Sequence, residues 1–561
     1  MVFNALIPPL SRIGKWDEAV YIYQGRLIAS GQLPEYALNP AVDAVYSVIY
    51  LCIQGARHWL EYTCWIGRGV FFLLLWVATF RIARALREEA HPLILIALAA
   101  VSPAIVLLLD NGTNAMFAAF AGLALAEMIP VMRRGAFERL WRASAFIGLA
   151  ALSRNEAPVL FVTFAAFAAF AAWRERRLRQ ALPAILLPFF ALTGGYVVLH
   201  GAVTGEWALG TRHRAYATFE QGHGMAFADT YGGRQPYVEG EIEARRLFGT
   251  PEENADSIFR AIARNPAAYF ARIPRLTRSA AGHAFDGYGK YLGIALALFA
   301  VRGLLALVQR RALPLAALLI AWSAYAGLYV LLCFQPHHLL IPFLAWFPIA
   351  AIGVDAWARN LDSRRERRVW TVGLATAAIL AAILLKPNST AVFAALVLLL
   401  TLWIAWIAHD ILRERHAPAA ALAGALILLS GSLALRAGPA FRVPVTPFGD
   451  PEQKAVDYLA ETFPPGTRVA AWGPGLVWAA NMEFVRIGIP QRDLETPESL
   501  AAWLAAEGAA AIVVDDDLRR FEPETAARLS GLNAHGYILG FATNGGEVLV
   551  LVRERRPSLP L

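Results

Sequence analysis

Long apolar runs, separated by short polar stretches, recur along the chain from residue 66 to about residue 435. A helix needs about 20 mostly apolar residues to cross the hydrocarbon core of a bilayer. The pattern therefore predicts a mainly α, polytopic helical membrane protein. In chain order, the predicted spans cover residues 66–83, 92–110, 113–132, 181–200, 291–308, 315–334, 338–357, 370–386, 390–410 and 418–436.

A further apolar stretch, residues 143–173, is interrupted by the polar sequence Ser153-Arg154-Asn155-Glu156 and then by Pro158. Proline disfavours helical backbone in the residue before it. We therefore expect two short half-helices here, with the polar tip near the outer face of the membrane. This brings the total to about twelve spans.

Arginine dominates the short loops between the spans, and short loops of this kind stay on the cytoplasmic side. The six loops are Arg81–Arg87, Arg133–Arg142, Arg174–Arg179, Arg310–Arg311, Arg359–Arg368 and Arg413–Arg415. Placing all six inside leaves residues 1–65, residues 201–290 and the tail from about residue 441 outside. The predicted location is a bacterial inner membrane, with both termini extracytoplasmic.

The tail differs from the rest of the chain because strand-like and helix-like segments alternate in it, which predicts a small α/β domain. The expected helices are Pro451–Phe463 and Glu498–Glu507, and the expected strands are Thr467–Trp472, Ala510–Val514, Tyr537–Ala542 and Glu547–Val552. We therefore divide the chain into a transmembrane domain, residues 1–440, and an extracytoplasmic α/β domain, residues 441–561.

Composition supports this division. Of the 561 residues, 57% are hydrophobic and 17% are charged, whereas a soluble globular protein carries roughly a quarter charged residues. The formal net charge is +8, but the cations are spread over inter-span loops rather than gathered on one soluble face, which argues against nucleic-acid binding. The three cysteines have no metal-ligand spacing. Cys52 and Cys64 could form a disulfide outside the membrane, but two unlinked thiols fit better.

The polar residues favour chemistry at the membrane surface over transport. Carriers usually show two related halves and charged groups inside their spans. The sequence has no evident internal repeat, and its polar residues lie mostly in the external segments. An enzyme is the leading hypothesis. A carrier or flippase for a lipid-linked sugar, and a non-catalytic protein whose external domain binds a partner, are the alternatives.

The first external segment contains two adjacent carboxylates, Asp17 and Glu18, at the start of a helix-like pattern that is followed by Gly31 and Pro34. Asp17 suits the N-terminus of a helix, where aspartate caps backbone N–H groups and favours the helix dipole. A carboxylate held at the bilayer surface could equally act as a general base on an acceptor hydroxyl. The sequence leaves both roles open.

An amphipathic stretch at about residues 41–60 follows in the same external segment. Together with this stretch and the arginine-flanked spans, the Asp-Glu pair resembles the type C glycosyltransferase superfamily, and more narrowly its protein O-mannosyltransferase and aminoarabinose-transferase-like branch. Further pieces in matching order are Ser102-Pro103, Gly148–Arg154, Ala263–Phe270 and His338–Pro342. The resemblance covers about residues 12–440, and a C-terminal external domain is also typical. Relatives carry a span before the Asp-Glu loop, whereas sixteen residues precede Asp17 here.

The resemblance implies a glycosyltransferase that moves a sugar from a polyprenyl-phosphate donor to an acceptor, with inversion at the anomeric carbon. The aspartate of the pair serves as catalytic base in relatives, so that role falls to Asp17, with Glu18 beside it. Relatives also place an acidic residue in the second external turn. Asn114 stands at that position here, and Asp110 lies one helical turn earlier, so Asp110 is our candidate for the second acid.

The donor phosphate needs cations, which arginine supplies as a bidentate fork and lysine as a point charge. Our candidates are Lys15, Arg154, Arg212 and His337; Glu156 could simply pair with Arg154. We expect no cofactor and no metal, because the adjacent histidines at 337 and 338 lack a third ligand. The expected partners are the polyprenyl-phosphate-linked sugar, membrane lipids and a lipid, polysaccharide or protein acceptor. The sequence identifies neither the sugar nor the acceptor.

Overall fold

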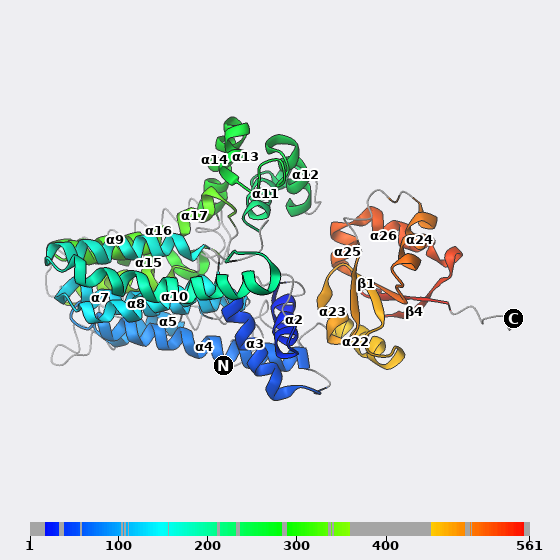
Figure 1. Cartoon of the computed structure of the whole chain (residues 1–561), viewed down its shortest axis with the longest axis horizontal. Helices are drawn as coiled ribbons and strands as arrows, with labels where there is room; N and C mark the ends of the chain where they lie inside the picture. The colour runs from blue at the N-terminus through cyan, green and yellow to red at the C-terminus, as the bar shows by residue number, and fades with distance from the viewer. Residues whose placement is uncertain are drawn as a thin grey trace, which may run out of the picture.

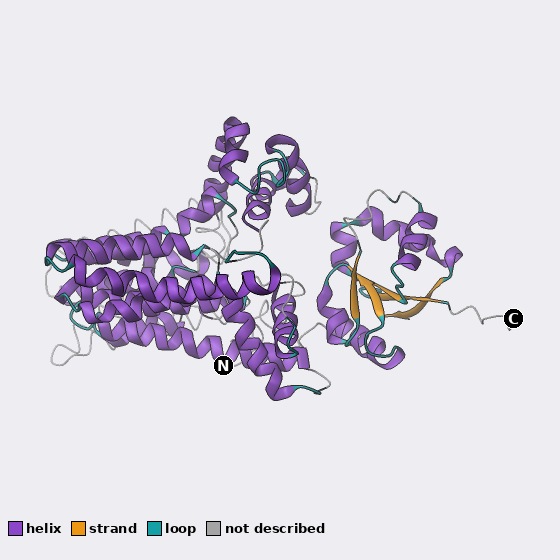
Figure 2. Cartoon of the chain, viewed as in Figure 1, coloured by secondary structure: helices purple, strands orange, loops and turns teal. Residues whose placement is uncertain are grey.

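The computed structural model describes residues 17–32, 39–56, 59–101, 105, 108–109, 111–154, 156–209, 214–231, 236–282, 289–334, 338, 341–359, 450–487, 494 and 496–554. Over these residues the chain forms a helix bundle, a small helical unit beside it and a domain that contains all the strands (Figure 2). The predicted spans at 370–386, 390–410 and 418–436 lie outside the described residues.

The bundle is built from long apolar helices that run side by side (Figure 1). Its helices are α4 (Trp59–Ala85), α5 (Pro92–Val101), α7 (Gly112–Arg134), α8 (Leu140–Ser153), α9 (Ala157–Arg174), α10 (Leu178–Thr204), α15 (Gly289–Gln309), α16 (Leu313–Ala324), α17 (Ala326–Leu331) and α18 (Phe343–Arg359). Within the described residues, five stretches are long and apolar enough to cross a membrane: α4, α7, α9, α10 and α16 together with α17. The protein is thus a multi-pass membrane protein, as predicted.

Helix α7 lies at the centre of the bundle. Of its most apolar 18-residue stretch, 94% is buried inside the protein, whereas the corresponding share for α10 is 22%. Close packing elsewhere depends on small residues, which let membrane helices approach backbone to backbone. Helices α15 and α18 cross at Gly303 and Gly353, where an added Cβ would clash with a backbone carbonyl of the opposite helix.

The polar break at residues 153–156 joins two helices of unequal length. Helix α8 has 14 residues, but α9 has 18 and is long enough to span the bilayer, so the prediction of two half-helices was wrong for α9. The reason is the place of Pro158. Proline in the first turn of a helix loses no backbone hydrogen bond there, so it begins α9 rather than shortening it.

Four of the predicted cytoplasmic loops meet at one end of the bundle. Arg133 pairs with Glu89 at 3.2 Å, and Arg310 donates to the backbone carbonyl of Glu89 at 2.8 Å. The guanidinium of Arg177 lies 6.0 Å from the ring centre of Phe137. Because α4, α7 and α10 each run the length of the bundle, the loops at their other ends lie on the opposite side (Figure 1).

At that opposite end lie two short helices, α2 (Asp17–Ala29) and α3 (Pro40–Ile53), and a separate helical unit. The unit consists of α11 (Arg214–Ala226), α12 (Pro236–Phe248), α13 (Ile258–Arg264) and α14 (Pro266–Gly282), with a 3₁₀ turn at Ala228–Thr230. It has its own small aromatic core, formed by Tyr216, Phe219, Phe248 and Tyr269. The bundle also includes a 3₁₀ turn, Phe137–Arg139, before α8.

The C-terminal domain is a five-stranded sheet with helices around it (Figure 2). Its elements are α22 (Asp450–Thr462), β1 (Arg468–Ala471), α23 (Pro474–Ala479), β2 (Glu483–Arg486), α24 (Pro497–Ala506), β3 (Ala511–Val514), α25 (Asp516–Phe521), α26 (Pro523–Leu529), a 3₁₀ turn (Ser530–His535), β4 (Tyr537–Ala542) and β5 (Leu549–Arg553). The strand order is β2-β1-β3-β5-β4, in which β1 pairs in parallel with β2 and β3, and β5 pairs antiparallel with β3 and β4. The six predicted elements are confirmed within a few residues, whereas β2 and the short helices α23, α25 and α26 were not predicted from the sequence.

Candidate active site

Helix α2 begins at the predicted Asp-Glu pair, and the two carboxylates have different surroundings. Asp17 is exposed in the first turn, where its charge favours the helix N-terminus. Glu18 is buried, with 1% of its surface exposed. A buried carboxylate is expensive unless it is paired, so the partner of Glu18 matters.

That partner is Arg68 of α4, which is fully buried. Its Nε donates to Glu18 Oε1 at 3.1 Å, and its Nη2 donates to Glu18 Oε2, so the pair is bidentate. The hydroxyl of Tyr46, from α3, donates to Glu18 Oε1 at 3.3 Å. Three helices are thereby joined through one carboxylate. Removing one partner of such a pair typically costs 3–5 kcal/mol, because a charge is left buried and uncompensated.

Tyr46 fits here because glycines from three helices surround it. A Cβ added at Gly25 of α2 would lie 2.6 Å from Tyr46 Cβ, and one at Gly112 of α7 would lie 2.8 Å from its hydroxyl. A Cβ at Gly67 of α4 would clash with the ring. The ring also packs edge-on against Phe71, with 5.7 Å between ring centres. The first turn of α7 is therefore in direct contact with the Glu18 cluster, which we define as Glu18, Arg68 and Tyr46.

The first turn of α7 also carries a second buried polar group. Asn111 caps the helix through its side chain, which accepts a hydrogen bond from the Thr113 backbone N–H at 3.0 Å. Asn114 follows inside the first turn and is 2% exposed. Its side-chain oxygen accepts a hydrogen bond from Nη1 of Arg154, the residue that follows α8 and caps its C-terminus.

Arg154 is held from several sides. Its Nε and Nη2 donate to the two carboxylate oxygens of Glu156, at 3.2 and 2.9 Å. Its guanidinium lies 5.7 Å from the ring centre of Tyr329, and His338 stacks on the same ring, with 3.8 Å between ring centres. We call Asn114, Arg154, Glu156, Tyr329 and His338 the Arg154 cluster. Like the Glu18 cluster, it contains one balanced arginine–glutamate pair.

The helical unit α11–α14 is pinned next to this cluster by Arg272. Nη2 of Arg272 donates to the backbone carbonyl of Leu331 at 3.0 Å, and Nη1 donates to that of Phe219 at 2.9 Å. The guanidinium lies 4.3 Å from the Phe219 ring centre and 4.6 Å from that of Tyr269. Burial among these groups lowers the pKa of Arg272 to about 10. Because Leu331 lies two residues after Tyr329, the unit borders the Arg154 cluster.

Two further groups of the unit are perturbed by burial. Burial raises the pKa of Glu220, although Arg245 donates to it at 2.9 Å and opposes this shift. Burial lowers the pKa of His223, whose Nε2 lies 3.5 Å from Glu243. Tyr231 donates to the same glutamate at 2.6 Å.

The C-terminal domain contacts α2 directly. Tyr23 stacks on Trp478 of α23, with ring centres 4.2 Å apart and planes 6° from parallel. The side-chain oxygen of Asn481 accepts hydrogen bonds from Arg26 at 3.2 Å and from Trp59 at 2.8 Å. Helix α2 therefore carries the Asp-Glu pair at its start and the docking surface for the sheet domain along its length.

The structure thus places three of the predicted site residues, Asp17, Glu18 and Arg154, at the same end of the bundle. Arg154 is paired with Glu156, which is the simpler interpretation that the sequence left open. Four other predicted site residues, Lys15, Asp110, Arg212 and His337, lie outside the described residues. Among the described residues, no group of three or more His, Cys, Asp or Glu side chains could hold a metal ion.

Sequence reasoning missed Arg68 and Tyr46. A signal for Arg68 was available, because it is a charged residue inside the predicted span 66–83, and such residues are rarely without a partner or a function. Tyr46 gave no comparable signal, since one tyrosine in an amphipathic segment is unremarkable until the three glycines around it are known. The cysteines Cys52, Cys64 and Cys333 are free thiols.

Solved structures with the same arrangement identify the fold. ArnT from Cupriavidus metallidurans superimposes on 98% of this chain and 96% of its own, with 15% identity and a TM-score of 0.53 in the apo state and 0.55 bound to undecaprenyl phosphate. The chain has the GT-C fold. The archaeal oligosaccharyltransferase AglB from Archaeoglobus fulgidus, in complex with an inhibitory peptide and a dolichol-phosphate, shares this GT-C fold with 14% identity and a TM-score of 0.50, over 100% of this chain and 74% of its own.

Both neighbours are GT-C membrane glycosyltransferases, so the resemblance noted in the sequence is confirmed at the level of fold. No protein-family model and no curated protein sequence matches the chain. At 14–15% identity, this likeness shows a shared fold.

Proposed function

We propose that the protein is a glycosyltransferase that moves a sugar from a polyprenyl-phosphate donor to an acceptor at the extracytoplasmic face of a bacterial inner membrane. The observation that carries the proposal is the buried Glu18 cluster, which fixes the first turn of α2 beside the Arg154 cluster at one end of a GT-C bundle. The donor class is supported by the lipid phosphates bound to the two structural neighbours.

In this proposal Asp17 is the catalytic base and Glu18 is a positioning residue. Asp17 is exposed, while its neighbour Glu18 is anchored to Arg68 and Tyr46, so the carboxylate of Asp17 sits on a fixed helix turn at the edge of the site. Orientation of a base toward its acceptor accounts for much of general-base catalysis. Asp110, the candidate second acid, precedes α7 in the chain and completes the assignment.

The reaction is a displacement at the anomeric carbon. Asp17 removes the proton from an acceptor hydroxyl, the hydroxyl oxygen forms a bond to the anomeric carbon, and the bond from that carbon to the phosphate oxygen breaks. The leaving polyprenyl phosphate gains negative charge, which Lys15, Arg212 and His337 stabilise in our assignment. The sugar is transferred with inversion, and the proton stays on Asp17 until solvent removes it.

Arg154 has a particular part in this assignment. Its charge is already balanced by Glu156, so a donor phosphate that contacts Arg154 has to compete with that carboxylate for the guanidinium. Arg154→Lys keeps the charge and loses the bidentate fork. We expect it to weaken donor binding while transfer at saturating donor persists. An unchanged Michaelis constant for the donor would mean that Arg154 only holds the α8–α9 turn.

The proposed orientation of the protein in the membrane follows from the position of its basic loops. The four described basic loops lie at one end of the bundle, and the candidate site lies at the other. Because short arginine-rich loops stay on the cytoplasmic side, we infer that the candidate site faces the extracytoplasmic side. Single cysteines at Arg176 and at Gly545, in a Cys52→Ser background, test this in intact spheroplasts with an impermeant thiol reagent. We expect labelling at position 545 alone. Labelling at 176 alone would reverse the topology.

Transfer itself is tested by comparing a deletion strain with its parent. The glycolipids, polysaccharides and glycoproteins of the envelope are analysed for a sugar that is lost on deletion and restored by the wild-type gene. A carrier would need its spans but not Asp17, whereas the proposed enzyme needs both. Restoration by an Asp17→Asn gene at normal protein level would therefore favour the carrier.

A further inference from the structure

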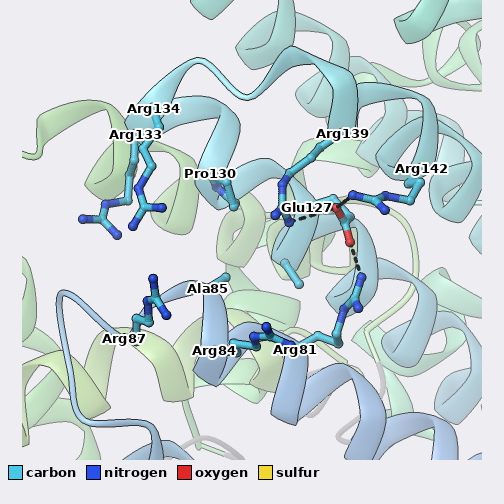
Figure 3. A pocket seen from close by; sticks show the side chains of 11 residues that line it. Arg81, Arg84, Ala85, Arg87, Glu127, Pro130, Arg133, Arg134, Arg139 and Arg142 are labelled. Carbon is cyan, nitrogen blue, oxygen red and sulfur yellow. Dashed lines mark hydrogen bonds and ion pairs between the residues drawn. The ribbon is translucent and has the colours of Figure 1, made fainter.

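Seven arginines and one glutamate line a cavity of about 330 Å³ at the end of the bundle opposite to the candidate active site (Figure 3). The lining arginines are Arg81, Arg84, Arg87, Arg133, Arg134, Arg139 and Arg142, and the glutamate is Glu127. They come from the C-terminal ends of α4 and α7, from the turn that follows α4, from the 3₁₀ turn Phe137–Arg139 and from the start of α8. We call this cavity the arginine pocket. Its volume is within the range of small-molecule sites.

Part of this charge is balanced from within. Glu127, which is 1% exposed, accepts hydrogen bonds from Arg81 at 2.6 Å and from Arg139 at 3.3 Å, and forms an ion pair with Arg142 at 3.1 Å. Figure 3 shows these three guanidinium groups converging on the one carboxylate. One negative charge thus faces three positive charges, so the group formed by Glu127 and its three arginines has a surplus of two positive charges.

The remaining arginines divide into two kinds. Arg133 and Arg134 both form ion pairs with Glu88, at the rim of the pocket. They also lie in the last turn of α7, where a positive charge favours the helix dipole. Arg84 and Arg87 are exposed and form no ion pair with any described residue. The positive-inside rule explains why arginines lie on this side, but not why so many face one hollow.

The apolar surface next to the pocket indicates what supplies the missing negative charge. Leu73, Val77 and Phe80 of α4 are 64%, 50% and 55% exposed. Their spacing of four and three residues puts them on one face of the helix, and Arg84 follows four residues later on the same face. At 1.5 Å per residue, Leu73 and Arg84 are about 16 Å apart along the helix. An acyl chain lying along this face would bring its headgroup to Arg84.

We propose that the arginine pocket binds the phosphate of an anionic phospholipid from the leaflet at this end of the bundle, with an acyl chain along Leu73, Val77 and Phe80. Arg84 and Arg87 donate to the phosphate oxygens, and the surplus charge around Glu127 adds a longer-range attraction. Basic pockets between transmembrane helices suit such headgroups. A free phosphate ion would use the arginines but gain nothing from the apolar face.

The test uses the purified full-length protein in a neutral detergent, with its thermal unfolding midpoint as readout. It is titrated separately with phosphatidylglycerol, with phosphatidylcholine and with inorganic phosphate. We expect phosphatidylglycerol to raise the midpoint and the other two to leave it unchanged at equal concentration. The double variant Arg84→Gln/Arg87→Gln should need about twenty-five-fold more phosphatidylglycerol for the same shift, since each cation near a membrane surface contributes about five-fold.

The matched control is Arg176→Gln/Arg179→Gln, which removes the same charge from exposed residues of a neighbouring basic loop outside the pocket. It should respond to phosphatidylglycerol as the wild type does. Should the double variant fail to fold, Arg84→Gln against Arg176→Gln gives the same comparison with a five-fold effect. An equal response of pocket variant and wild type, or an equal loss in the control, would overturn the site. An equal shift by inorganic phosphate would overturn the lipid assignment.

Discussion

At each end of the helix bundle a buried glutamate pairs with arginine, but the net charge of the two groups differs. Glu18 meets one arginine, Arg68, and both side chains are at most 1% exposed. Glu127 is equally buried but meets three arginines that are 36–55% exposed. The first arrangement is neutral and enclosed, which suits a scaffold that must hold one geometry. The second retains positive charge and is open to solvent, which suits attraction of an anion.

The sharpest way to test this comparison is to remove one arginine from each end. Arg68→Ala leaves Glu18 buried without a partner, so we expect a loss of about 3–5 kcal/mol in stability. Arg81→Ala leaves Glu127 with two other arginines, and we expect a loss below about 1 kcal/mol, as for exposed ion pairs. Thermal unfolding in one detergent measures both.

A second chemical variant separates charge from packing at the buried end. Replacing both members of the pair, Glu18→Met with Arg68→Met, removes the charges together, and we expect it to restore most of the stability lost in Arg68→Ala. If the double variant is as unstable as Arg68→Ala, the pair acts mainly through its shape. Equal effects of Arg68→Ala and Arg81→Ala would remove the contrast between the two ends.

The next effect concerns the close packing around Tyr46. An alanine at Gly67 would bring Cβ against the Tyr46 ring, and overpacking of this kind costs about 1–3 kcal/mol. Gly69, two residues later on the same helix, has open space within 4 Å of an added Cβ. Gly69→Ala should therefore be neutral or stabilising by up to about 1 kcal/mol. Equal unfolding midpoints for Gly67→Ala and Gly69→Ala would contradict the enclosed geometry of the Glu18 cluster.

A smaller effect is expected where the sheet domain docks on α2. The stacked pair Tyr23 and Trp478 should contribute about 0.5–1.5 kcal/mol beyond its buried area. A double-mutant cycle with Tyr23→Ala and Trp478→Ala measures this coupling through unfolding midpoints. Tyr62→Ala, at an exposed tyrosine of α4, replaces Tyr23→Ala in the control cycle, and its coupling to Trp478 should be near zero. Additive effects in the first cycle would mean that the domain docks without this contact.

The smallest effect concerns pH and the unit α11–α14. Burial lowers the pKa of His223, with Arg272 acting in the same direction and Glu243 opposing it. Because the folded state binds the proton less readily than the unfolded chain, stability is fully present above about pH 6.5 and falls as the pH drops below it. Hydrogen exchange in residues 214–282 should accelerate between pH 7 and pH 5.5, and less so in His223→Gln. Identical pH profiles for the two proteins would contradict this.

The helix bundle could be predicted because insertion into a membrane requires long apolar segments and favours arginine in the cytoplasmic loops. Apolar length predicted the long helices of the bundle, and arginine predicted the four described loops that share one end, since both follow from the cost of burying charge in hydrocarbon. The length of α9 could not be predicted from its break, because Pro158 can either begin a helix or end one. The short strand β2 lacks a run of β-branched residues and is held by its pairing with β1.

The candidate site was predictable in part. The Asp17-Glu18 pair stood out as two adjacent acids before a helix, but the sequence did not reveal which of them is buried. That depends on Arg68, 50 residues away from Glu18, and on Tyr46 from a third helix. The pairing of Arg154 with Glu156 was accessible because the two are neighbours in sequence, whereas the contact of Arg154 with Asn114 required the packing of α7 against α8.

The central claim is that Asp17 removes a proton from the acceptor, and one substitution tests it most directly. Asp17→Asn keeps size and helix-capping ability, since asparagine caps about as well as aspartate, but removes the base. With purified protein, a polyprenyl-phosphate-linked sugar and the acceptor found in the deletion strain, we expect transfer to fall about a hundred- to ten-thousand-fold, with donor affinity and unfolding midpoint unchanged. Near-normal transfer by a folded Asp17→Asn protein would contradict the account and move the role of base to Asp110.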